Sequence, residues 1–570
     1  MPLTVPKDYT ILQAARSAGF NIPTLCYLKD INEIGACRVC VVAVKGARSL
    51  VASCVYPVSE GLEISTNSLR VQRSRRTTLE LILSNHDRRC LSCSRSGECE
   101  LQVLCREYGV DAEHRFDGEN PRVALDDSTE YLIRDNNKCI LCRRCVGACA
   151  AQTTGVIGAN DRGFDTHIAC AFEAPLADTP CVGCGQCIVN CPTGALQEKD
   201  DTDKVWEALH DESKFVIVHT APSIRATLGE CFNMPIGTNV KGKMVAALRR
   251  LGFDRVFDTD FGADLTIMEE ANEFVERFTN GGKLPMITSC SPGWINYCEQ
   301  YYPDFIDNLS TCKSPQQMTG AIIKTWYAQQ MGLNPKDIFV VSIMPCTAKK
   351  AEIHRPEQAA SGYPDIDVSL TTRELARMIN RAHIYFTELP DEEFDPSLGD
   401  STGAGAIFGA TGGVMEAALR TAADTITGKD LSQIDYHEVR GTDGIKIATY
   451  DIKDISVKVA VASGLNNAKK LLDRVRAGEH FDFIEIMCCP GGCVNGGGQP
   501  LQPSYVYNFT DLKSKRADAL YKEDEALPKR KSHQSPLMIK LYKEFLEEPG
   551  SHIAHQILHT SYSKKEKPVR

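Results

Sequence analysis

Two cysteine runs between residues 139 and 192 decide how the first third of this chain folds. They read Cys139-Ile-Leu-Cys-Arg-Arg-Cys-Val-Gly-Ala-Cys149 and Cys181-Val-Gly-Cys-Gly-Gln-Cys-Ile-Val-Asn-Cys191-Pro192. This spacing is typical of paired [4Fe–4S] clusters, in which the fourth cysteine of each run ligates the other cluster. A zinc site does not need eight cysteines in this pattern. The expected ligand sets are Cys139, Cys142, Cys145 and Cys191 for one cluster, and Cys181, Cys184, Cys187 and Cys149 for the other.

Two further ligand patterns precede these runs. The first is Cys26-x10-Cys37-x2-Cys40-x13-Cys54, whose four thiolates suit a [2Fe–2S] cluster, with a zinc site as the alternative. The second is His86-x3-Cys90-x2-Cys93-x5-Cys99. A lone histidine is usually a surface residue, but a position just before Cys-x2-Cys favours a [4Fe–4S] cluster with one imidazole ligand. Cys105 and Cys170 fit no set and are expected in the core.

The bulk composition limits the function classes. The chain has 570 residues, 25 cysteines and a net charge of -10, and 43% of its residues are hydrophobic. The acidic balance argues against nucleic acid as a partner. No apolar run reaches the roughly 18–20 residues of a membrane span, and the N-terminus lacks the apolar core of a secretory signal. We therefore expect a cytoplasmic protein without disulfides.

The rest of the chain has the pattern of an α/β domain. Apolar runs of strand length begin at Lys214 and Asp337, and each breaks at a proline before a helix-like segment. Strands that alternate with helices predict a parallel sheet, with functional residues in the loops after its strands. An amphipathic segment from Leu537 predicts a helical tail.

Three later segments combine cysteine with glycine, proline and methionine. They are Thr288-Ser-Cys-Ser-Pro-Gly-Trp294, Met344-Pro-Cys-Thr-Ala-Lys-Lys-Ala-Glu352 and Glu485-Ile-Met-Cys-Cys-Pro-Gly-Gly-Cys-Val-Asn-Gly-Gly-Gly-Gln-Pro500. Glycines allow the backbone to approach a bulky group closely, and methionines supply a soft apolar lining. A zinc site would explain the cysteines but not the glycines and methionines that accompany them.

These three segments resemble the signature motifs of FeFe hydrogenases, and the upstream cysteine patterns resemble the clostridial type with four accessory clusters. The resemblance implies a multidomain α/β protein, in which small ferredoxin-like iron–sulfur domains precede a two-lobed α/β catalytic domain. The implied domains are a plant-type [2Fe–2S] domain (1–70), a His/Cys3 [4Fe–4S] domain (71–125), a two-cluster ferredoxin-like domain (126–205), the catalytic domain (206–515) and a helical tail (516–570).

The resemblance also implies an H-cluster, a [4Fe–4S] cubane linked to a di-iron centre with CO, cyanide and azadithiolate. Cys346, Cys489 and Cys493 then resemble cubane ligands, and Lys349 and Ser223 resemble cyanide contacts. The other positions that resemble the pocket lining are Gln316, Met344, Phe408 and Met487.

A proton path is implied in the same way. Cys290 resembles the thiol that passes protons to the bridging amine, and Glu270, Ser310 and Glu273 resemble the rest of the chain toward the surface. A thiol and two carboxylates can each hold or release a proton. Judged from the residues alone, Glu270 and Glu273 favour a solvated helix face.

Position 291 departs from the family pattern. The first motif usually has two adjacent cysteines, of which the second ligates the cubane, but here the pair is Cys290 and Ser291. Ser291 ligates through oxygen or leaves an iron open, or else Cys290 is the ligand. Compensation by another cysteine, such as Cys298 or Cys312, depends on the course of the loop.

The reaction that the resemblance implies is 2 H+ + 2 e− ⇌ H2. Electrons would come from ferredoxin or from a flavin subunit that oxidises NADH, because residues 1–200 also resemble the cluster-bearing subunit of respiratory NADH dehydrogenases. Maturation proteins that install the di-iron unit are further implied partners. Two other classes stay open, namely a slow H2 sensor and a non-catalytic iron–sulfur carrier or assembly protein.

Overall fold

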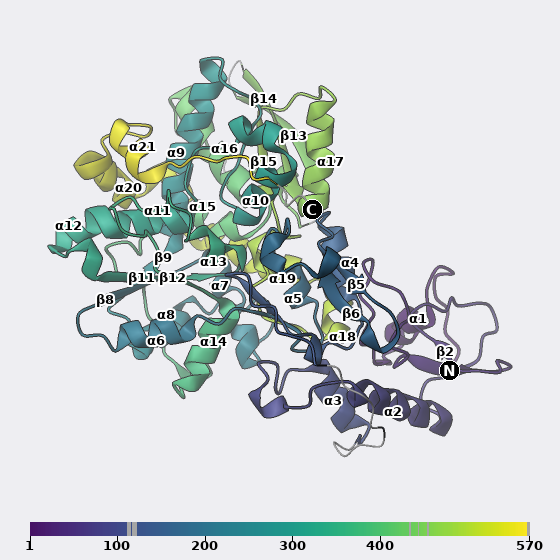
Figure 1. The fold of residues 1–570 in the computed structure, drawn as a ribbon. Coiled ribbons are helices and arrows are strands. Elements are labelled where there is room, and N and C mark those ends of the chain that lie inside the picture. Colours follow the sequence, from purple (N-terminus) through teal and green to yellow (C-terminus); the bar gives the residue numbers. More distant parts are fainter. Residues whose placement is uncertain (111–115, 117–121, 433–434, 443, 453–454, 567–570) are drawn as a thin grey trace. The chain divides into compact units, whose positions relative to one another are not determined.

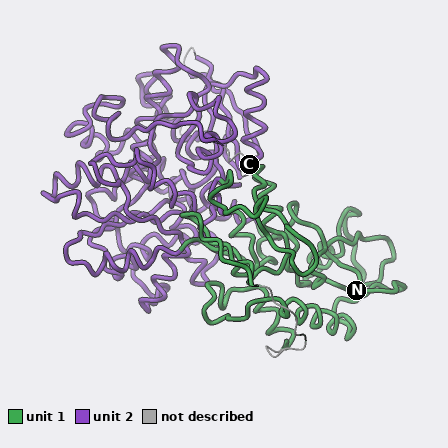
Figure 2. The backbone as a smooth tube through the Cα atoms, in the orientation of Figure 1, with its two compact units in different colours: residues 1–181, 186–199, 501–510 green, residues 182–185, 200–500, 511–570 purple. Residues whose placement is uncertain are grey.

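The chain folds into two compact units, shown in different colours in Figure 2. The computed structural model describes residues 1–110, 116, 122–432, 435–442, 444–452 and 455–566. The first unit comprises residues 1–181, 186–199 and 501–510, and the second comprises residues 182–185, 200–500 and 511–570.

The N-terminal part of the first unit is a small antiparallel sheet with helices. Strand β1 (Val41–Val44) pairs with β2 (Val51–Ala52) on one side and with β3 (Ile64–Ser65) on the other. Thr10 caps the first helix with a complete capping box, which satisfies its free amides. The helices of this part are α1 (Ile11–Ser17), α2 (Leu69–Ser84) and α3 (Glu100–Glu107).

The remainder of the first unit is built on two antiparallel strand pairs. They are β4 (Leu132–Arg134) with β7 (Leu196–Glu198), and β5 (Ile157–Asn160) with β6 (His167–Cys170). Short helices follow the cysteine runs, namely α4 (Arg144–Ala151) and α5 (Gln186–Val189). Residues 501–510 join this unit from far along the chain, since Arg144 donates to Ser504 Oγ at 2.9 Å.

The first sheet of the second unit is fully parallel, with strand order β12-β11-β8-β9. Successive residues of a strand point to opposite faces. Val216 and Val218 of β8 therefore pack with helix α8 on one face, while Ile217 packs with α9 and α11 on the other. The elements are β8 (Phe215–Thr220), α8 (Lys241–Leu251), β9 (Arg255–Asp258), α9 (Thr259–Thr279), α11 (Pro315–Ile322), β11 (Ile338–Met344) and β12 (Val368–Thr371).

The second sheet has the order β10-β15-β14-β13 and is antiparallel only at β13. Helices α9 and α16 pack on one face, and α10 and α17 pack on the other. The elements are β10 (Met286–Ile287), α10 (Pro292–Tyr301), α16 (Gly413–Thr427), β13 (Ile445–Ile452), β14 (Ile455–Ser463), α17 (Leu465–Arg476) and β15 (Phe483–Met487).

Helix α9 connects the two lobes of the second unit, which lie apart in Figure 1. Its Phe261 and Leu265 belong to the core of the first sheet, and its Ala263 and Ile267 belong to the core of the second. The sequence therefore predicted correctly both the α/β class and the two lobes. In the described part of the chain, no helix combines the length and apolar character needed to cross a bilayer.

The C-terminal segment is helical, as the amphipathic pattern indicated. It comprises α19 (Leu512–Ala526), α20 (Pro536–Leu541) and α21 (His552–Leu558). Three of the domain boundaries expected from the sequence fall inside helices, after residue 70 in α2, after 205 in α6 (Thr202–Leu209) and after 515 in α19. These boundaries were placed between motifs, and the spacing of cysteine motifs does not show where a helix begins or ends.

A buried ion-pair network ties α19 to the first sheet. Arg225 is 0% exposed and reaches Asp258 at 2.6 Å, Glu523 at 2.8 Å and Asp260 at 3.1 Å. Because Asp258 and Asp260 lie out of water, they depend on this guanidinium for their charge balance, whereas Glu523 also pairs with Lys241 at 3.2 Å.

Replacement of Arg225 by leucine should therefore destabilise the protein by about 3–5 kcal/mol, because unpaired carboxylates stay buried. Arg381→Leu is the matched control, since its ion pair with Asp203 is exposed and such pairs contribute only about 0–1 kcal/mol. Calorimetry should give a much lower apparent Tm for Arg225→Leu. Equal shifts for the two variants would contradict this account.

Candidate active site

The first unit brings together the side chains of two predicted ligand sets. Cys139, Cys142, Cys145 and Cys191 line one small cavity, although Cys191 is far from the others in sequence. Burial raises the pKa of Cys139 to about 12. Cluster binding must therefore displace a proton from this thiol, which is the usual coupling of metal binding to pKa.

The four cysteines expected to hold the [2Fe–2S] cluster also lie together. Cys40 Sγ is 3.3 Å from Cys54 Sγ, and the Cys37 amide donates to Cys26 Sγ at 3.4 Å. The contact with Cys26 holds the pKa of Cys37 down at about 6. Paired thiols of this kind suit a bridged iron pair.

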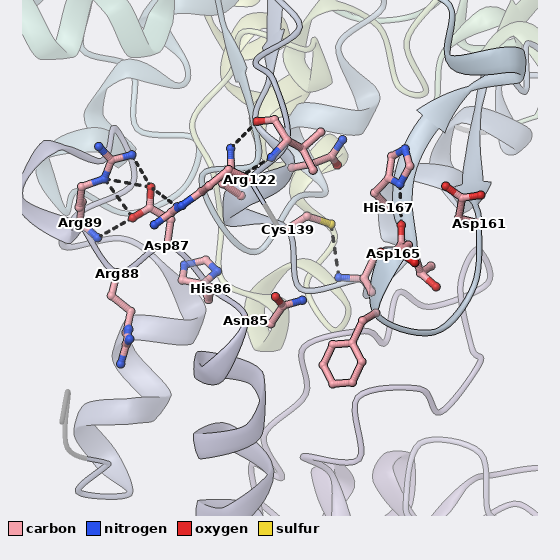
Figure 3. A pocket seen from close by; sticks show the side chains of 16 residues that line it. Asn85, His86, Asp87, Arg88, Arg89, Arg122, Cys139, Asp161, Asp165 and His167 are labelled. Carbon is pink, nitrogen blue, oxygen red and sulfur yellow. Dashed lines mark hydrogen bonds and ion pairs between the residues drawn. The ribbon is translucent and has the colours of Figure 1, made fainter. Parts of the chain in front are cut away.

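His86 lies in a pocket of about 630 Å³ that Cys139 also lines (Figure 3). Its Nδ1 is buried and has no hydrogen-bond partner in the described part of the chain. Burial lowers the pKa of His86 to about 4, which favours the neutral imidazole that binds metals. The neighbouring Asp87 is held by Arg89 at 2.7 Å. These features fit the predicted ligand role.

The other predicted cluster ligands are placed as follows. Cys90 and Cys93 adjoin one turn of 3-10 helix, in which the Cys93 amide donates to the Cys90 carbonyl at 3.0 Å, and Cys99 directly precedes α3. Cys149, Cys181 and Cys187 belong to the hydrophobic cluster around strands β4 to β7. Cys184 belongs to the second unit. Cys105 and Cys170 are buried, as expected of core residues.

The second unit contains a cavity at the carboxyl ends of its parallel strands. Loops after β8, β11, β10 and β15 contribute Ser223, Cys346, Cys290 and Cys489 respectively, and the volume of the cavity is about 70 Å³. This edge is where α/β sheets place their ligands. Every residue predicted for the pocket lines this cavity: Ser223, Cys290, Gln316, Met344, Cys346, Lys349, Phe408, Met487, Cys489 and Cys493.

The polar groups of the cavity suit an anionic, iron-containing group. Ser223 Oγ is buried without a hydrogen-bond partner among the described residues, so a ligand that accepts from it would satisfy it. Lys349 contributes a cation beside the thiols, with Nζ 3.2 Å from the Cys290 carbonyl and 2.9 Å from Glu352. Gln316 also donates to Glu352, at 2.9 Å. Several thiolates, one lysine and an unsatisfied hydroxyl fit the predicted cubane and cyanide-bearing iron pair.

The structure adds one cysteine that the sequence analysis missed. Cys488 lines the cavity together with Cys290, Cys346, Cys489 and Cys493. The sequence did contain a signal for this residue: the third motif has two adjacent cysteines, Cys488 and Cys489, while the first motif lacks the cysteine expected at position 291. The two alternatives considered before, Cys298 and Cys312, are both buried, in the core clusters of the second and first sheets respectively.

The predicted proton path follows α9 and the loop after β10. Glu270 is 0% exposed, which excludes a solvated helix face for this residue. Its pKa is raised to about 8, chiefly by burial and then by Glu273. Ser310 Oγ donates to Glu273 Oε2 at 2.8 Å, and Arg277 holds Glu273 at 2.5 Å. Cys290 lies at the inner end, where burial and Glu270 raise its thiol pKa.

The raised pKa of Glu270 has a consequence for stability. A carboxyl with a pKa of 4.5 unfolded and about 8 folded binds more protons in the folded state, so the protein loses stability as pH rises through this interval. The Glu270→Gln variant has no carboxyl to ionise at this position, so it should not show this loss of stability with rising pH. Its apparent Tm should exceed that of the wild type increasingly as pH approaches about 8.

Glu276→Gln is the control, because this carboxylate is exposed on the same helix. If the difference in apparent Tm between Glu270→Gln and the wild type did not change with pH, this would count against a buried, protonated Glu270.

Four parts of the chain match known protein families. Residues 214–497 match the family described as iron only hydrogenase large subunit, C-terminal domain, and residues 510–565 match iron hydrogenase small subunit. Residues 1–68 match a 2Fe-2S iron-sulfur cluster binding domain, and residues 75–114 match the NADH-ubiquinone oxidoreductase-G iron-sulfur binding region.

Similar proteins cover nearly the whole chain. "NADP-reducing hydrogenase subunit HndD" of Solidesulfovibrio fructosivorans is 51% identical over 99% of this chain and 98% of its own. "Iron hydrogenase 1" of Clostridium pasteurianum is 45% identical over 98% of each chain. A solved variant of the FeFe hydrogenase HydA1 of Chlamydomonas reinhardtii is 41% identical with a TM-score of 0.56, and the match covers 63% of this chain and 98% of that one. The chain therefore belongs to the iron-only (FeFe) hydrogenase family.

Proposed function

We propose that this chain catalyses 2 H+ + 2 e− ⇌ H2 at the cavity of the second unit. The observation that carries the proposal is that cysteines from three separate loops line one cavity, and that the buried Glu270 acts on one of them, raising the pKa of Cys290. An iron–sulfur carrier would need the thiols but not the path.

The residues of the cavity have separate roles. Cys346, Cys489 and Cys493 would hold the cubane, and Lys349 and Ser223 would bind cyanide ligands. The H-cluster, when bound, supplies the redox chemistry and the site at which protons and electrons combine. Met344, Met487 and Phe408 line the cavity with apolar surface and limit the access of water.

Protons would move between solvent and the cavity through side chains. Glu273 takes a proton at its half-buried carboxylate, Ser310 relays it through its hydroxyl, and Glu270 passes it to Cys290 Sγ. A pKa of about 8 lets Glu270 hold and release protons near neutral pH, which is the condition for efficient general acid–base transfer.

Electrons would pass through the first unit. We infer one [2Fe–2S] and three [4Fe–4S] accessory clusters from the cysteine sets, and the cysteines of two of these sets lie close together in this unit. The relative described as an NADP-reducing hydrogenase subunit suggests a partner subunit that oxidises or reduces a nicotinamide cofactor. Ferredoxin is the alternative partner.

Infrared spectroscopy of protein matured with its di-iron unit, with H2 evolution assayed on the same sample, tests the proposal. Bands of iron-bound CO and cyanide together with rapid turnover are expected. Bands with negligible turnover would favour an H2 sensor, and the absence of bands after competent maturation would contradict the di-iron assignment.

Glu270→Gln gives a test specific to the proton path. Loss of one proton-transfer group should lower H2 evolution by at least about 100-fold. The CO and cyanide bands should remain, because Glu270 does not line the cavity. Glu276→Gln should evolve H2 at the wild-type rate. Full H2 evolution by Glu270→Gln would show that Glu270 is not part of the proton path.

A further inference from the structure

The two adjacent parallel strands β10 and β15 bring positions 291 and 488 together. Ile287 is the register partner of Ile484, and Ser291 and Cys488 each lie four residues further along their chains. The Cys488 amide donates to Ser291 Oγ at 3.3 Å, so the two loops are still side by side at this point. A side chain at either position therefore reaches the same part of the cavity.

The local packing leaves room for the Cys488 side chain. A Cβ atom at Gly293 would lie 2.6 Å from Cys488 Sγ, which is closer than real contacts allow. Any side chain at position 293 would push this sulfur away. Cys488 itself is only 3% exposed and lines the cavity.

The number of cavity cysteines matches one cubane. Five line the cavity, and Cys290 stands at the inner end of the proton path. A [4Fe–4S] cluster takes four thiolates. We propose that Cys488, together with Cys346, Cys489 and Cys493, ligates the cubane, and that it replaces the cysteine missing at position 291. This inference rests on the proposed function, because it concerns the same cubane.

The alternatives fit less well. Ser291 Oγ already accepts the Cys488 amide, and iron–sulfur clusters prefer soft thiolates to oxygen ligands. Cys298 donates to the Tyr302 carbonyl at 3.4 Å, and Cys312 lies 3.8 Å from Glu273. Neither of these cysteines lines the cavity.

The test uses the full chain produced without di-iron maturation, so that iron, sulfide and EPR report the clusters themselves. Cys488→Ser is nearly isosteric and should preserve the fold, but it should lose or alter the cubane EPR signal, with loss of up to about four irons per chain. Cys298→Ser is the matched control, a buried cysteine outside the cavity, and should keep wild-type iron and spectrum. The exchange variant Ser291→Cys/Cys488→Ser should restore both.

An unchanged iron content and spectrum in Cys488→Ser would overturn the assignment. In that event, loss of the cubane in Ser291→Ala or Cys290→Ser would identify the true fourth ligand. Failure of the exchange variant to restore the cubane would also count against the proposal. The proposed function is tested separately, in matured wild-type protein, and fails if CO and cyanide bands or turnover are absent. That result would not change the iron content of the unmatured variants, so the two failures can be told apart.

Discussion

The arrangement of the site depends on one constraint, the convergence of parallel strand ends. Strands β8 and β11 of one sheet and β10 and β15 of the other end at the same cavity, so four loops far apart in sequence contribute to it. Parallel sheets buried on both faces hold such ends rigidly. Helix α9 packs into both cores and thereby fixes the two sheets to each other.

The same packing sets the electrostatics. Because α9 lies between two hydrophobic cores, Glu270 on that helix is removed from water, and its pKa rises to about 8. Glu273 is only three residues further along, but it is half-buried and bonded to Arg277 and Ser310. A short stretch of one helix therefore carries a fully buried carboxyl, Glu270, and one turn later a partly exposed carboxyl, Glu273.

The sequence predicted those features that are local. Spacing within a run brought Cys139, Cys142 and Cys145 together, and apolar strand patterns gave the parallel sheet. The burial of Glu270 could not be read from its helix, because it arises from packing against a second sheet. The neighbourhood of Ser291 and Cys488 depends on the register between strands almost 200 residues apart, which no local pattern encodes. The resemblance to a family placed the remaining pocket residues.

The central claim is that a buried proton path meets a hydrogen-activating group at the cavity of the second unit. Isotope exchange tests it most directly, with matured protein in ordinary water under D2 and the gas analysed by mass spectrometry. The account predicts that wild-type protein forms HD, because deuterium leaves through Cys290 and Glu270 and solvent protons return by the same path, and that Glu270→Gln exchanges far more slowly. No HD from wild-type protein that carries a complete di-iron unit would contradict the account.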